Sequence, residues 1–385
     1  MRIATILFTY NRPYHTNQVL SYLRNSYILP DMLYVFHDGP KENCKMEDWN
    51  KVDSIIRKID WCECMILSSK NNKGLAKSVI EGINYVLNDF DAVIVLEDDC
   101  IPAKGFMNYM YEGLIKYEND KEAWGITGFS WPINMEKNTD VDVYACGRIA
   151  TWGWGTWKNR WMNYKKDINI VDRIRSTPEG SIMLDTWGSD LDNMLENSVK
   201  KKNDSWAVYW ALQVIESKGY YITPYESLIQ NIGFDGSGTN CGRDELFESY
   251  SNMLTEKRIF RFPNRIEIQD NVRYSFSSFK GSRVALGISD FVAPAVIVYG
   301  TGSLYREKED QILSKYRIAL FIDNKKRGYY GGIRIISSRQ LFPEIIDNIG
   351  IVGIIVMIRD ENEKRIVIRE LVDEVGIQTK YILGV

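Results

Sequence analysis

Blocks of apolar and polar residues alternate along the first hundred residues of the chain. Continuous apolar runs are typical of buried strands, and they fall at residues 3–8, 32–37, 65–67 and 92–96. Between these runs, apolar residues recur at the spacing of one helix face, as at Val79, Ile83 and Val86. A repeated strand-then-helix order predicts an α/β fold with a mostly parallel sheet flanked by helices.

The same pattern restarts near residue 295. Strands are predicted at 296–299, 318–322, 351–358 and 380–383, with helices at 306–314 and 363–375. This order predicts a small Rossmann-like α/β domain. A chain of 385 residues is also longer than one typical domain. We therefore expect two domains, at residues 1–285 and 290–385.

One turn of the second domain partly matches a dinucleotide-binding fingerprint. Gly300 and Gly302 follow the predicted strand at 296–299, and Asp323 ends the next strand. Tyr305 stands where the fingerprint has its third glycine. Two interpretations stay open: this domain binds a nucleotide, or it is a packing module that docks a protein partner.

Composition narrows the class of protein. Charged residues make up 26% of the chain but nearly cancel, and a net charge of -3 gives no electrostatic case for nucleic-acid binding. Six scattered cysteines and two histidines show no zinc-binding spacing, so reduced thiols in a cytoplasm are the simpler explanation. No apolar run approaches the length of a membrane span, and Asn11-Arg12-Pro13 follows the first run in place of a signal-peptide cleavage site. We therefore expect a cytoplasmic protein.

A basic segment joins the two predicted domains at residues 257–283. Its cations stand among phenylalanines and are Lys257, Arg258, Arg261, Arg265, Arg273, Lys280 and Arg283. A solvated linker is the simpler interpretation. The alternative is a peripheral contact with the anionic inner face of a membrane, where a lipid-linked acceptor would be found.

Three carboxylates, Glu97, Asp98 and Asp99, directly follow the apolar run at 92–96. Ligands of open α/β sheets bind just outside the carboxyl ends of the strands, where this acidic triplet would lie. Adjacent carboxylates repel one another and lose solvation there, so we expect a positively charged partner. Oxygen ligands favour Mg²⁺ or Mn²⁺ over zinc. The triplet therefore predicts a metal site, and the simpler alternative is a solvated acidic turn.

Further polar residues follow the other predicted strands: Asn11 and Arg12, then Asp38, then Lys73. Because parallel strands end at one edge of the sheet, these side chains should gather near the acidic triplet. A guanidinium, an isolated carboxylate and a metal site together suit a nucleotide diphosphate. Each residue alone could instead serve a loop or a cap, and Asp38 before Gly39 could shape a turn.

Four tryptophans stand between Thr151 and Trp161. Trp154, Trp157 and Trp161 share helical spacing, which favours a hydrophobic core beneath a helix. The alternative is an apolar platform for a sugar ring, formed by Trp152 and Trp154, where neighbouring glycines let the backbone approach a ligand closely. The two interpretations are compatible.

Four motifs, in this order, resemble those of GT-A-type, nucleotide-sugar-dependent glycosyltransferases of the bacterial family-2 type. They are Phe8-Thr9-Tyr10-Asn11-Arg12-Pro13, His37-Asp38-Gly39, Asn72-Lys73-Gly74-Leu75-Ala76, and the acidic triplet in the place of the family's DxD motif. Around the triplet, the chain is similar to N-acetylglucosaminyltransferase I. The tryptophan segment also looks like one in bacterial polysaccharide glycosyltransferases. The resemblance covers residues 1–285 and implies a GT-A-like fold for them.

The resemblance implies a role for each motif. Asp99 would bind the metal ion, Asp98 would face the ribose or the sugar, and Asp38 would contact the base. The other implied nucleotide-sugar-binding residues are Thr9, Tyr10, Asn11, Arg12, Lys73, Gly74 and Glu97.

The resemblance also implies a catalytic base near the tryptophans. Inverting sugar transfer needs a carboxylate that takes the proton of the acceptor hydroxyl. Asp204 is the implied base, and Asp190 and Asp192 are the next candidates. The simpler interpretation is that Asp204 or Ser205 caps a helix that carries Trp206.

Together these features predict an inverting glycosyltransferase that depends on Mn²⁺ or Mg²⁺. It would move a hexosyl or N-acetylhexosaminyl group from a nucleotide-diphosphate donor, first of all a UDP-sugar, to a glycan or lipid-linked acceptor in bacterial surface polysaccharide or glycoconjugate synthesis. The alternative is a non-catalytic nucleotide-sugar or dinucleotide-binding scaffold protein that organises other enzymes through its C-terminal domain. Intact Asp98, Asp99 and Asp204 favour the enzyme.

Overall fold

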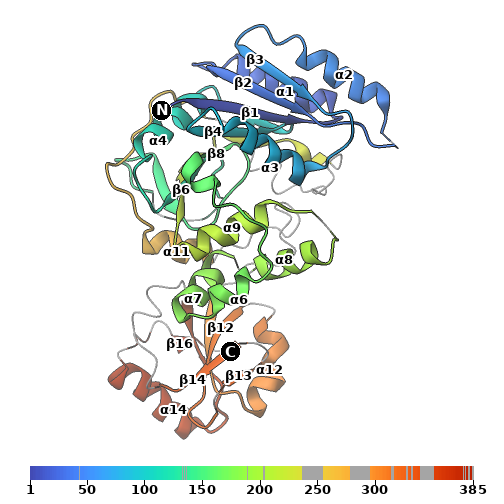
Figure 1. The fold of residues 1–385 in the computed structure, drawn as a ribbon. Coiled ribbons are helices and arrows are strands. Elements are labelled where there is room, and N and C mark those ends of the chain that lie inside the picture. Colours follow the sequence, from blue (N-terminus) through green and yellow to red (C-terminus); the bar gives the residue numbers. More distant parts are fainter. Residues whose placement is uncertain are drawn as a thin grey trace.

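The computed structural model forms two α/β units (Figure 1). It describes residues 1–42, 44–131, 133, 135, 137–188, 190–202, 204–235, 255–277, 295–313, 316–326, 328–330, 333–338, 351–375, 377, 379 and 382–383. The predicted boundary between the domains, at 285–290, falls outside these residues and stays a prediction.

The first unit is built on an eight-stranded sheet with the order β3-β2-β1-β4-β8-β6-β9-β7. Its strands are β1 (Ile3–Thr9), β2 (Met32–His37), β3 (Glu63–Ser68), β4 (Ala92–Glu97), β6 (Ala123–Thr127), β7 (Val143–Cys146), β8 (Trp154–Trp157) and β9 (Tyr220–Pro224). The pairs β1–β2, β1–β4, β2–β3 and β6–β9 are parallel, and β7 and β8 run antiparallel to their neighbours. The predicted α/β class with a mostly parallel sheet is confirmed.

Helices cover both faces of the parallel half of this sheet. They are α1 (Pro13–Arg24), α2 (Met46–Ile56), α3 (Leu75–Val86) and α4 (Phe106–Lys116). Along β1, Ile6 and Phe8 join the core under α3, whereas Ile3 and Leu7 join the core under α1, α2 and α4. Every residue of β1 is buried. Cover on both faces explains why this strand is a nearly continuous apolar run instead of an alternating one.

The parallel register aligns the carboxyl ends of β1, β2 and β4. Phe8 pairs with Phe36 of β2 and with Glu97 of β4, and Thr9 pairs with His37. The loops that follow these three strands therefore leave the sheet side by side. This alignment produces the edge at which the sequence predicts a gathering of polar residues.

Most of the other elements of the first unit extend the core under α3, whereas β5 and β10 join the core under α1, α2 and α4. They are α5 (Lys158–Trp161), α6 (Ile170–Arg175), α7 (Pro178–Trp187), α8 (Leu191–Val199), α9 (Ala207–Glu216), α11 (Asp270–Ser277), a small antiparallel sheet of β5 (Cys100–Pro102) and β10 (Ile229–Asn231), and the 3₁₀ turn η1 (Gly233–Asp235). Figure 1 shows α6, α7, α8 and α9 between the large sheet and the second unit. In the part of the chain that the structure describes, no helix has the length and apolar character needed to cross a membrane.

The tryptophan segment is mostly a strand, so the predicted helical spacing is wrong. Trp154 and Trp157 lie on β8, and only Trp161 lies in the short helix α5. Two strand residues three positions apart point to opposite faces, and so Trp154 lies in the core under α3 and Trp157 in the core under α4. The core interpretation itself holds, because Trp154, Trp157 and Trp161 are at most 2% exposed.

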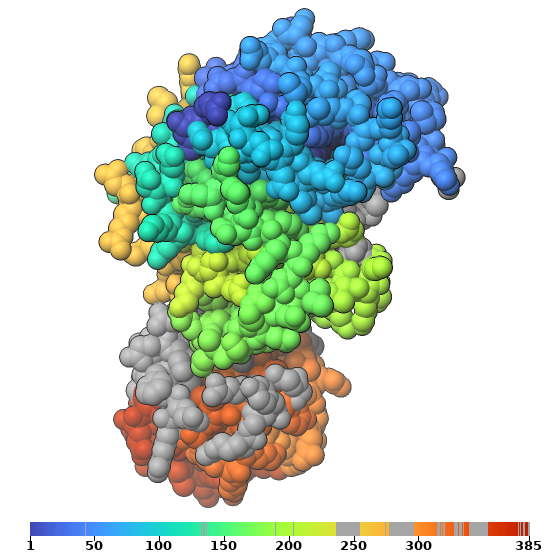
Figure 2. Space-filling view, viewed as in Figure 1, coloured from blue at the N-terminus to red at the C-terminus, as the bar shows by residue number. Residues whose placement is uncertain are grey.

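The second unit is a six-stranded sheet with the order β13-β14-β12-β11-β15-β16. Its elements are β11 (Ala295–Tyr299), α12 (Ser303–Leu313), β12 (Arg317–Ile322), β13 (Gly328–Tyr330), β14 (Ile333–Ile336), β15 (Ile351–Val356), α14 (Glu361–Arg369), the π-helix η3 (Glu370–Glu374) and β16 (Ile382–Leu383). β11 runs parallel to both β12 and β15, as expected of a Rossmann-like unit. Figure 2 shows this unit, in orange and red, below the green helices of the first unit.

Candidate functional site

Two buried carboxylates and one guanidinium form the centre of the candidate site. Glu97 ends β4, and Asp98 and Asp99 form the turn to β5. Only 5% of Asp98 and 7% of Asp99 is exposed. Nη2 of Arg12 donates to Oδ1 of Asp98 and, at 2.9 Å, to Oδ2 of Asp99. Arg12 therefore supplies the positively charged partner that the sequence predicts for the triplet.

The start of α1 holds Arg12 in place. Pro13 occupies the first turn of this helix, where its missing N–H costs no hydrogen bond. The carbonyl of Arg12 accepts the backbone N–H of Thr16 at 3.0 Å and its hydroxyl at 2.9 Å. With its backbone fixed after β1, Arg12 extends its side chain to the end of the neighbouring strand β4.

Burial and mutual repulsion shift the pKa values of this cluster. Burial, followed by the charges of Asp99 and Asp98, raises the pKa of Glu97 to about 8. Burial also raises the pKa of Asp98, although Arg12 opposes the shift. Burial acts to lower the pKa of Arg12, but the two carboxylates outweigh it and the pKa rises. Arg12 is therefore a permanent cation beside carboxyl groups whose ionisation is costly.

One nitrogen of the Arg12 guanidinium lacks a hydrogen-bond partner among the described residues. Its Nη1 is buried and has no hydrogen-bond partner among the residues described, whereas Nη2 serves both carboxylates. A buried N–H without a partner costs free energy unless water or a ligand accepts its hydrogen bond. A phosphate oxygen is a strong acceptor for a guanidinium.

The carboxylates suit a metal ion only together with a ligand. Within the described ranges, no three His, Cys, Asp or Glu side chains converge to hold an ion by themselves. Oδ2 of Asp99 binds Arg12, and Oδ1 lies 3.4 Å from the thiol of Cys100. Mg²⁺ in nucleotide sites needs only one or two carboxylates, because phosphate oxygens and water complete its shell. The donor set therefore fits a hard cation shared with a diphosphate, and not a cation enclosed by protein alone.

A segment that sequence reasoning missed lies against the acidic triplet. The N–H of Ile232 donates to the carbonyl of Asp99 at 2.9 Å. Nε2 of His15, on α1, lies 3.2 Å from the carbonyl oxygen of Ile232 and 3.2 Å from Oδ2 of Asp235. More than 200 positions separate His15 from this segment. Gly233 is the one local signal that could have drawn attention to it.

Asp38 is fully engaged in shaping its loop. Its Oδ1 accepts the backbone N–H groups of Gly39 and Lys73, and its Oδ2 accepts the side chain of Asn72 and the N–H of Gly74, each at 2.9 Å. Four hydrogen bonds fill the acceptor positions of a carboxylate. The structure thus bears out the turn-shaping interpretation, and contact with a base would require one of these bonds to break.

Thr9, Tyr10 and Asn11 lie at the expected edge of the sheet. Oγ1 of Thr9 shares a hydrogen bond of 3.1 Å with Nδ1 of His37, and both residues are buried. The hydroxyl of Tyr10 accepts the backbone N–H of Lys41 at 3.2 Å. Tyr10 and Asn11 are partly exposed, so these two remain accessible to a ligand at this edge.

Lys73 and Gly74 lie at the start of α3. Nζ of Lys73 pairs with Glu81 at 2.8 Å, so its charge is used on the surface of α3 and not at the triplet. Gly74 has a φ of 78°, which favours glycine, and is the N-cap residue of α3. Gly74 and Asp38 together join the loops after β2 and β3.

Of the two tryptophans predicted as a sugar platform, only Trp152 is accessible. Trp154 is 0% exposed and stacks on Trp206 with ring centroids 5.2 Å apart, so it offers no face to a sugar. Trp152 is partly exposed and packs edge-on against Phe129 and Phe234, at 4.6 and 5.5 Å. Because Phe234 belongs to η1, Trp152 lies next to the segment beside the triplet.

Asp204 precedes α9 but does not cap it. Its side chain is 63% exposed and pairs with Lys166 at 2.6 Å. The hydroxyl of Ser205 instead accepts a long hydrogen bond of 3.4 Å from the N–H of Val208. Among the described residues, the ion pair of Asp204 is with Lys166, whereas Arg12 pairs with Asp98 and Asp99. The structure therefore does not bring Asp204 into contact with Arg12 at the centre of the candidate site.

The two other candidate bases are held by arginines. Asp190 is 1% exposed, and both of its oxygens accept from Arg148 at 2.7 Å, which is itself 6% exposed. Asp192 pairs with Arg175 at 2.6 Å. An acceptor hydroxyl cannot reach a buried carboxylate in a two-armed ion pair, so Asp190 has a structural role.

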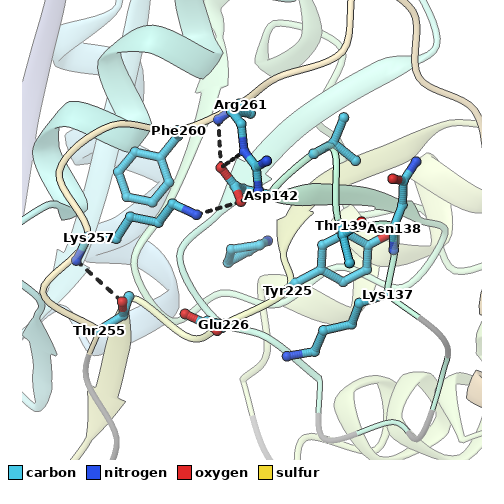
Figure 3. A pocket seen from close by; sticks show the side chains of 12 residues that line it. Lys137, Asn138, Thr139, Asp142, Tyr225, Glu226, Thr255, Lys257, Phe260 and Arg261 are labelled. Carbon is cyan, nitrogen blue, oxygen red and sulfur yellow. Dashed lines mark hydrogen bonds and ion pairs between the residues drawn. The ribbon is translucent and has the colours of Figure 1, made fainter.

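A cavity of about 250 Å³ lies away from the triplet, at the edge of β7 and β9. Its lining includes residues 137–139, 141–142, 224–226, 255, 257 and 260–261. Figure 3 shows Lys257 and Arg261 turned toward Asp142, with nitrogen–oxygen distances of 2.5 and 3.0 Å. The start of the basic segment is thus fastened to the first unit and is not a free linker. Lys280 and Arg283 lie outside the described residues.

The glycine turn of the second unit is packed internally. Gly300 has a φ of 100°, and Asp323 accepts the hydroxyl of Thr301 at 2.7 Å. Tyr305 is 1% exposed and packs edge-on against Phe321 at 5.0 Å. The acid and the aromatic residue therefore serve the turn and the core, which favours the packing interpretation over dinucleotide binding.

Comparison with known proteins gives distant structural matches alone. No family model matches the chain, and no curated protein does. The structure of S. aureus TarS has 9% identity and a TM-score of 0.28, covering 45% of this chain and 30% of that one. S. aureus TarS 1-349 in complex with UDP has 7% identity and a TM-score of 0.35, covering 60% and 59%. The mannosyltransferase PcManGT from Pyrobaculum calidifontis in complex with GDP-Man and Mn²⁺ has 10% identity and a TM-score of 0.33, covering 56% and 73%.

The matches to TarS span less than two thirds of those chains, 30% and 59% in the two cases. TM-scores between 0.28 and 0.35 are too low to define a shared fold. Activity, donor, metal and acceptor are therefore proposals for this protein.

We expect that removing one partner of the buried Arg148–Asp190 pair destabilises the fold more than replacing both partners with apolar residues. Arg148→Met should lower the free energy of unfolding by about 3 kcal/mol, because it leaves an unpaired buried carboxylate. The double variant Arg148→Met/Asp190→Leu should recover most of the loss. Urea titration measures both, and Lys51→Met, in an exposed pair with Glu47, is the control that should change little. Equal effects of Arg148→Met and Lys51→Met would contradict the structural role.

We expect His37 to make stability depend on pH. Burial lowers its pKa in the folded protein below the unfolded value of about 6.5. The unfolded chain therefore binds the proton first, so stability is complete above about pH 6.5 and falls as pH drops through the folded pKa. His37→Asn can keep the bond to Thr9 without titrating. Its melting temperature should fall less than that of the wild type between pH 7.5 and 5.5, and parallel falls would refute the assignment.

Proposed function

We propose that this protein is an inverting, metal-dependent glycosyltransferase. It transfers a hexosyl or N-acetylhexosaminyl group from a nucleotide-diphosphate donor, first of all a UDP-sugar, to a hydroxyl acceptor. The observation that supports this best is Arg12 between Asp98 and Asp99 at the carboxyl edge of β1 and β4. There the protein offers both a cation for phosphate and carboxylates for a metal ion.

The main requirement of this reaction is to stabilise the negative charge that develops on the leaving group. As the bond from the sugar to the diphosphate breaks, negative charge collects on the diphosphate. Nη1 of Arg12 is a buried donor with no partner among the described residues, and a phosphate oxygen that enters the site would accept its hydrogen bond. Mg²⁺ or Mn²⁺, when bound, supplies further neutralisation of the leaving group. Asp99 would hold that ion, and Asp98 beside it would face the ribose or the sugar.

The sugar needs an apolar surface beside the charged centre. Trp152 is partly exposed and packs against Phe234, which belongs to the segment that touches Asp99. Aromatic side chains offer such a surface and carry a polar atom for hydrogen bonding. Trp152 is therefore the proposed platform, and Trp154 supports it from the core.

The base of the reaction is proposed to be Asp204. Its side chain is 63% exposed, so an acceptor hydroxyl can approach it, in contrast to the buried Asp190. The ion pair with Lys166 must open, or turn aside, when the acceptor binds. The carboxylate then takes the hydroxyl proton as the oxygen attacks the anomeric carbon.

The proposed setting is synthesis of a bacterial surface polysaccharide or glycoconjugate, in the cytoplasm, with a glycan or lipid-linked acceptor. A peripheral membrane contact would use the exposed cations of the basic segment. Lys257 and Arg261 are bound to Asp142, whereas Arg258 and Arg265 are exposed, with Arg258 lying 5.3 Å from the ring of Tyr27.

We expect Asp99→Asn to abolish turnover while the fold survives. The amide keeps the size of the side chain and an oxygen for Arg12 but loses the charge that binds a cation, so kcat/KM should fall by at least about 100-fold. Release of nucleoside diphosphate from a panel of UDP- and GDP-sugars with Mn²⁺ or Mg²⁺ measures it. Asp172→Asn, on the exposed side of α6, is the matched control. Wild-type turnover by Asp99→Asn would remove the metal role, and nucleotide binding without turnover in the wild type would favour the scaffold alternative.

We expect Asp204→Asn to separate donor binding from transfer. Donor affinity, measured by calorimetry, should stay within a factor of two of wild type, while transfer should fall by about 100-fold or more because the proton acceptor is lost. Lys166→Met is the companion variant, since it frees the carboxylate without removing it. Unchanged transfer by Asp204→Asn would move the base to another residue.

A further inference from the structure

The segment Asn231–Asp235 is built onto the acidic triplet through the backbone. β10 pairs antiparallel with β5, and Asn231 is the partner of Cys100, the residue that follows the triplet. The ladder continues one step further, because the N–H of Ile232 donates to the carbonyl of Asp99 at 2.9 Å. The position of this segment relative to Asp99 is therefore fixed by the three residue pairs of β10 and β5 and by the hydrogen bond of Ile232 that follows them.

Gly233 brings the segment into contact with the side chain of Asp99. A Cβ on Gly233 would overlap Oδ2 of Asp99 and lie 3.1 Å from its Cγ. The N–H of Gly233 is already held by the side chain of Asn231 at 2.7 Å, so the backbone has little freedom to retreat. Asn231 is 4% exposed and Gly233 is buried. Glycine is required here for space, and any side chain must displace the carboxylate.

Contacts on three sides thus restrict the carboxylate of Asp99. Arg12 binds Oδ2 at 2.9 Å, the thiol of Cys100 donates to Oδ1 at 3.4 Å, and the backbone of Gly233 lies against a third side. A carboxylate confined in this way keeps one rotamer. Pre-oriented ligands of this kind are what a binding site needs to hold an ion or a phosphate with little loss of side-chain entropy.

His15 fastens the far end of the segment. It is 6% exposed and lies on α1, three residues after Arg12. Its Nε2 lies 3.2 Å from both the carbonyl oxygen of Ile232 and Oδ2 of Asp235. The start of α1 therefore carries both Arg12, the cation of the site, and His15, which holds the segment that confines Asp99.

We propose that residues 231–235, clasped by His15, are a positioning element that sets the orientation of Asp99 for the donor's metal-bound diphosphate. This inference rests on the proposed function and assigns positioning roles to Gly233 and His15, neither of which touches the substrate in this scheme. Residues that orient a metal ligand without binding the metal usually affect affinity or activity by about 10- to 100-fold when changed.

The test compares two Gly→Ala variants in the full-length protein. Gly233→Ala forces Asp99 aside, whereas a Cβ on Gly302, in the second unit, meets no atom within 4 Å. Calorimetry with UDP and with GDP, each with Mn²⁺, should show binding weakened at least about tenfold in Gly233→Ala and unchanged in Gly302→Ala. A thermal melt of each variant reports whether the fold survives.

Variants of His15 provide a second test of the positioning role, and this test remains decisive if Gly233→Ala does not fold. His15→Ala should weaken nucleotide binding, and His15→Gln should restore part of it, because its amide can donate to the carbonyl of Ile232. Wild-type affinity in both Gly233→Ala and His15→Ala would overturn the positioning role while leaving the proposed function intact. If the wild-type protein itself bound neither nucleotide, the proposed function would fall, and the positioning role with it.

Discussion

Asp98 and Asp99 are buried side by side at the end of a central strand, and the guanidinium of Arg12 compensates their charge. Burying carboxylates without a partner would cost more than a marginally stable domain can afford. The neighbouring positions of β1 and β4, the proline at the start of α1 and the fixed backbone of Arg12 all serve this compensation. The site proposed for a phosphate and a cation uses the same arrangement.

The edge that carries this cluster is assembled from loops that stabilise one another. Asp38 gathers the loops after β2 and β3 with four hydrogen bonds, and Gly74 completes that junction at the start of α3. On the other side, the residues after β10 lie against Asp99 under the control of His15. Several residues with the appearance of ligands are therefore supports. Among the described residues, Nη1 of Arg12 is a buried donor without a partner at this edge, and Tyr10, Asn11 and Trp152 are partly exposed there.

The second unit follows a different principle. Its polar residues at the strand ends bind one another. Asp323 binds Thr301, and Ser338 donates its N–H to Asn324 and its hydroxyl to Glu370. Its apolar residues form their own cores, which Ile182 of α7 extends toward the first unit. Hydrogen bonding within the unit, of this kind, suits a module that packs against the rest of the protein or docks a partner.

The sequence by itself determined the strands, because a strand covered on both faces must be a nearly continuous apolar run, and β1, β2 and β4 lie where those runs lie. It also determined the edge at which Arg12, Asp38 and the triplet meet, since parallel strands end together. Only the tertiary structure decided which polar groups bind other groups of the protein and which can still bind a ligand. The four bonds of Asp38, the Lys166 partner of Asp204, the strand conformation of Trp154 and the clasp of His15 on Asp235 depend on contacts between distant parts of the chain. Local spacing carries no record of such contacts, because packing of whole elements sets them.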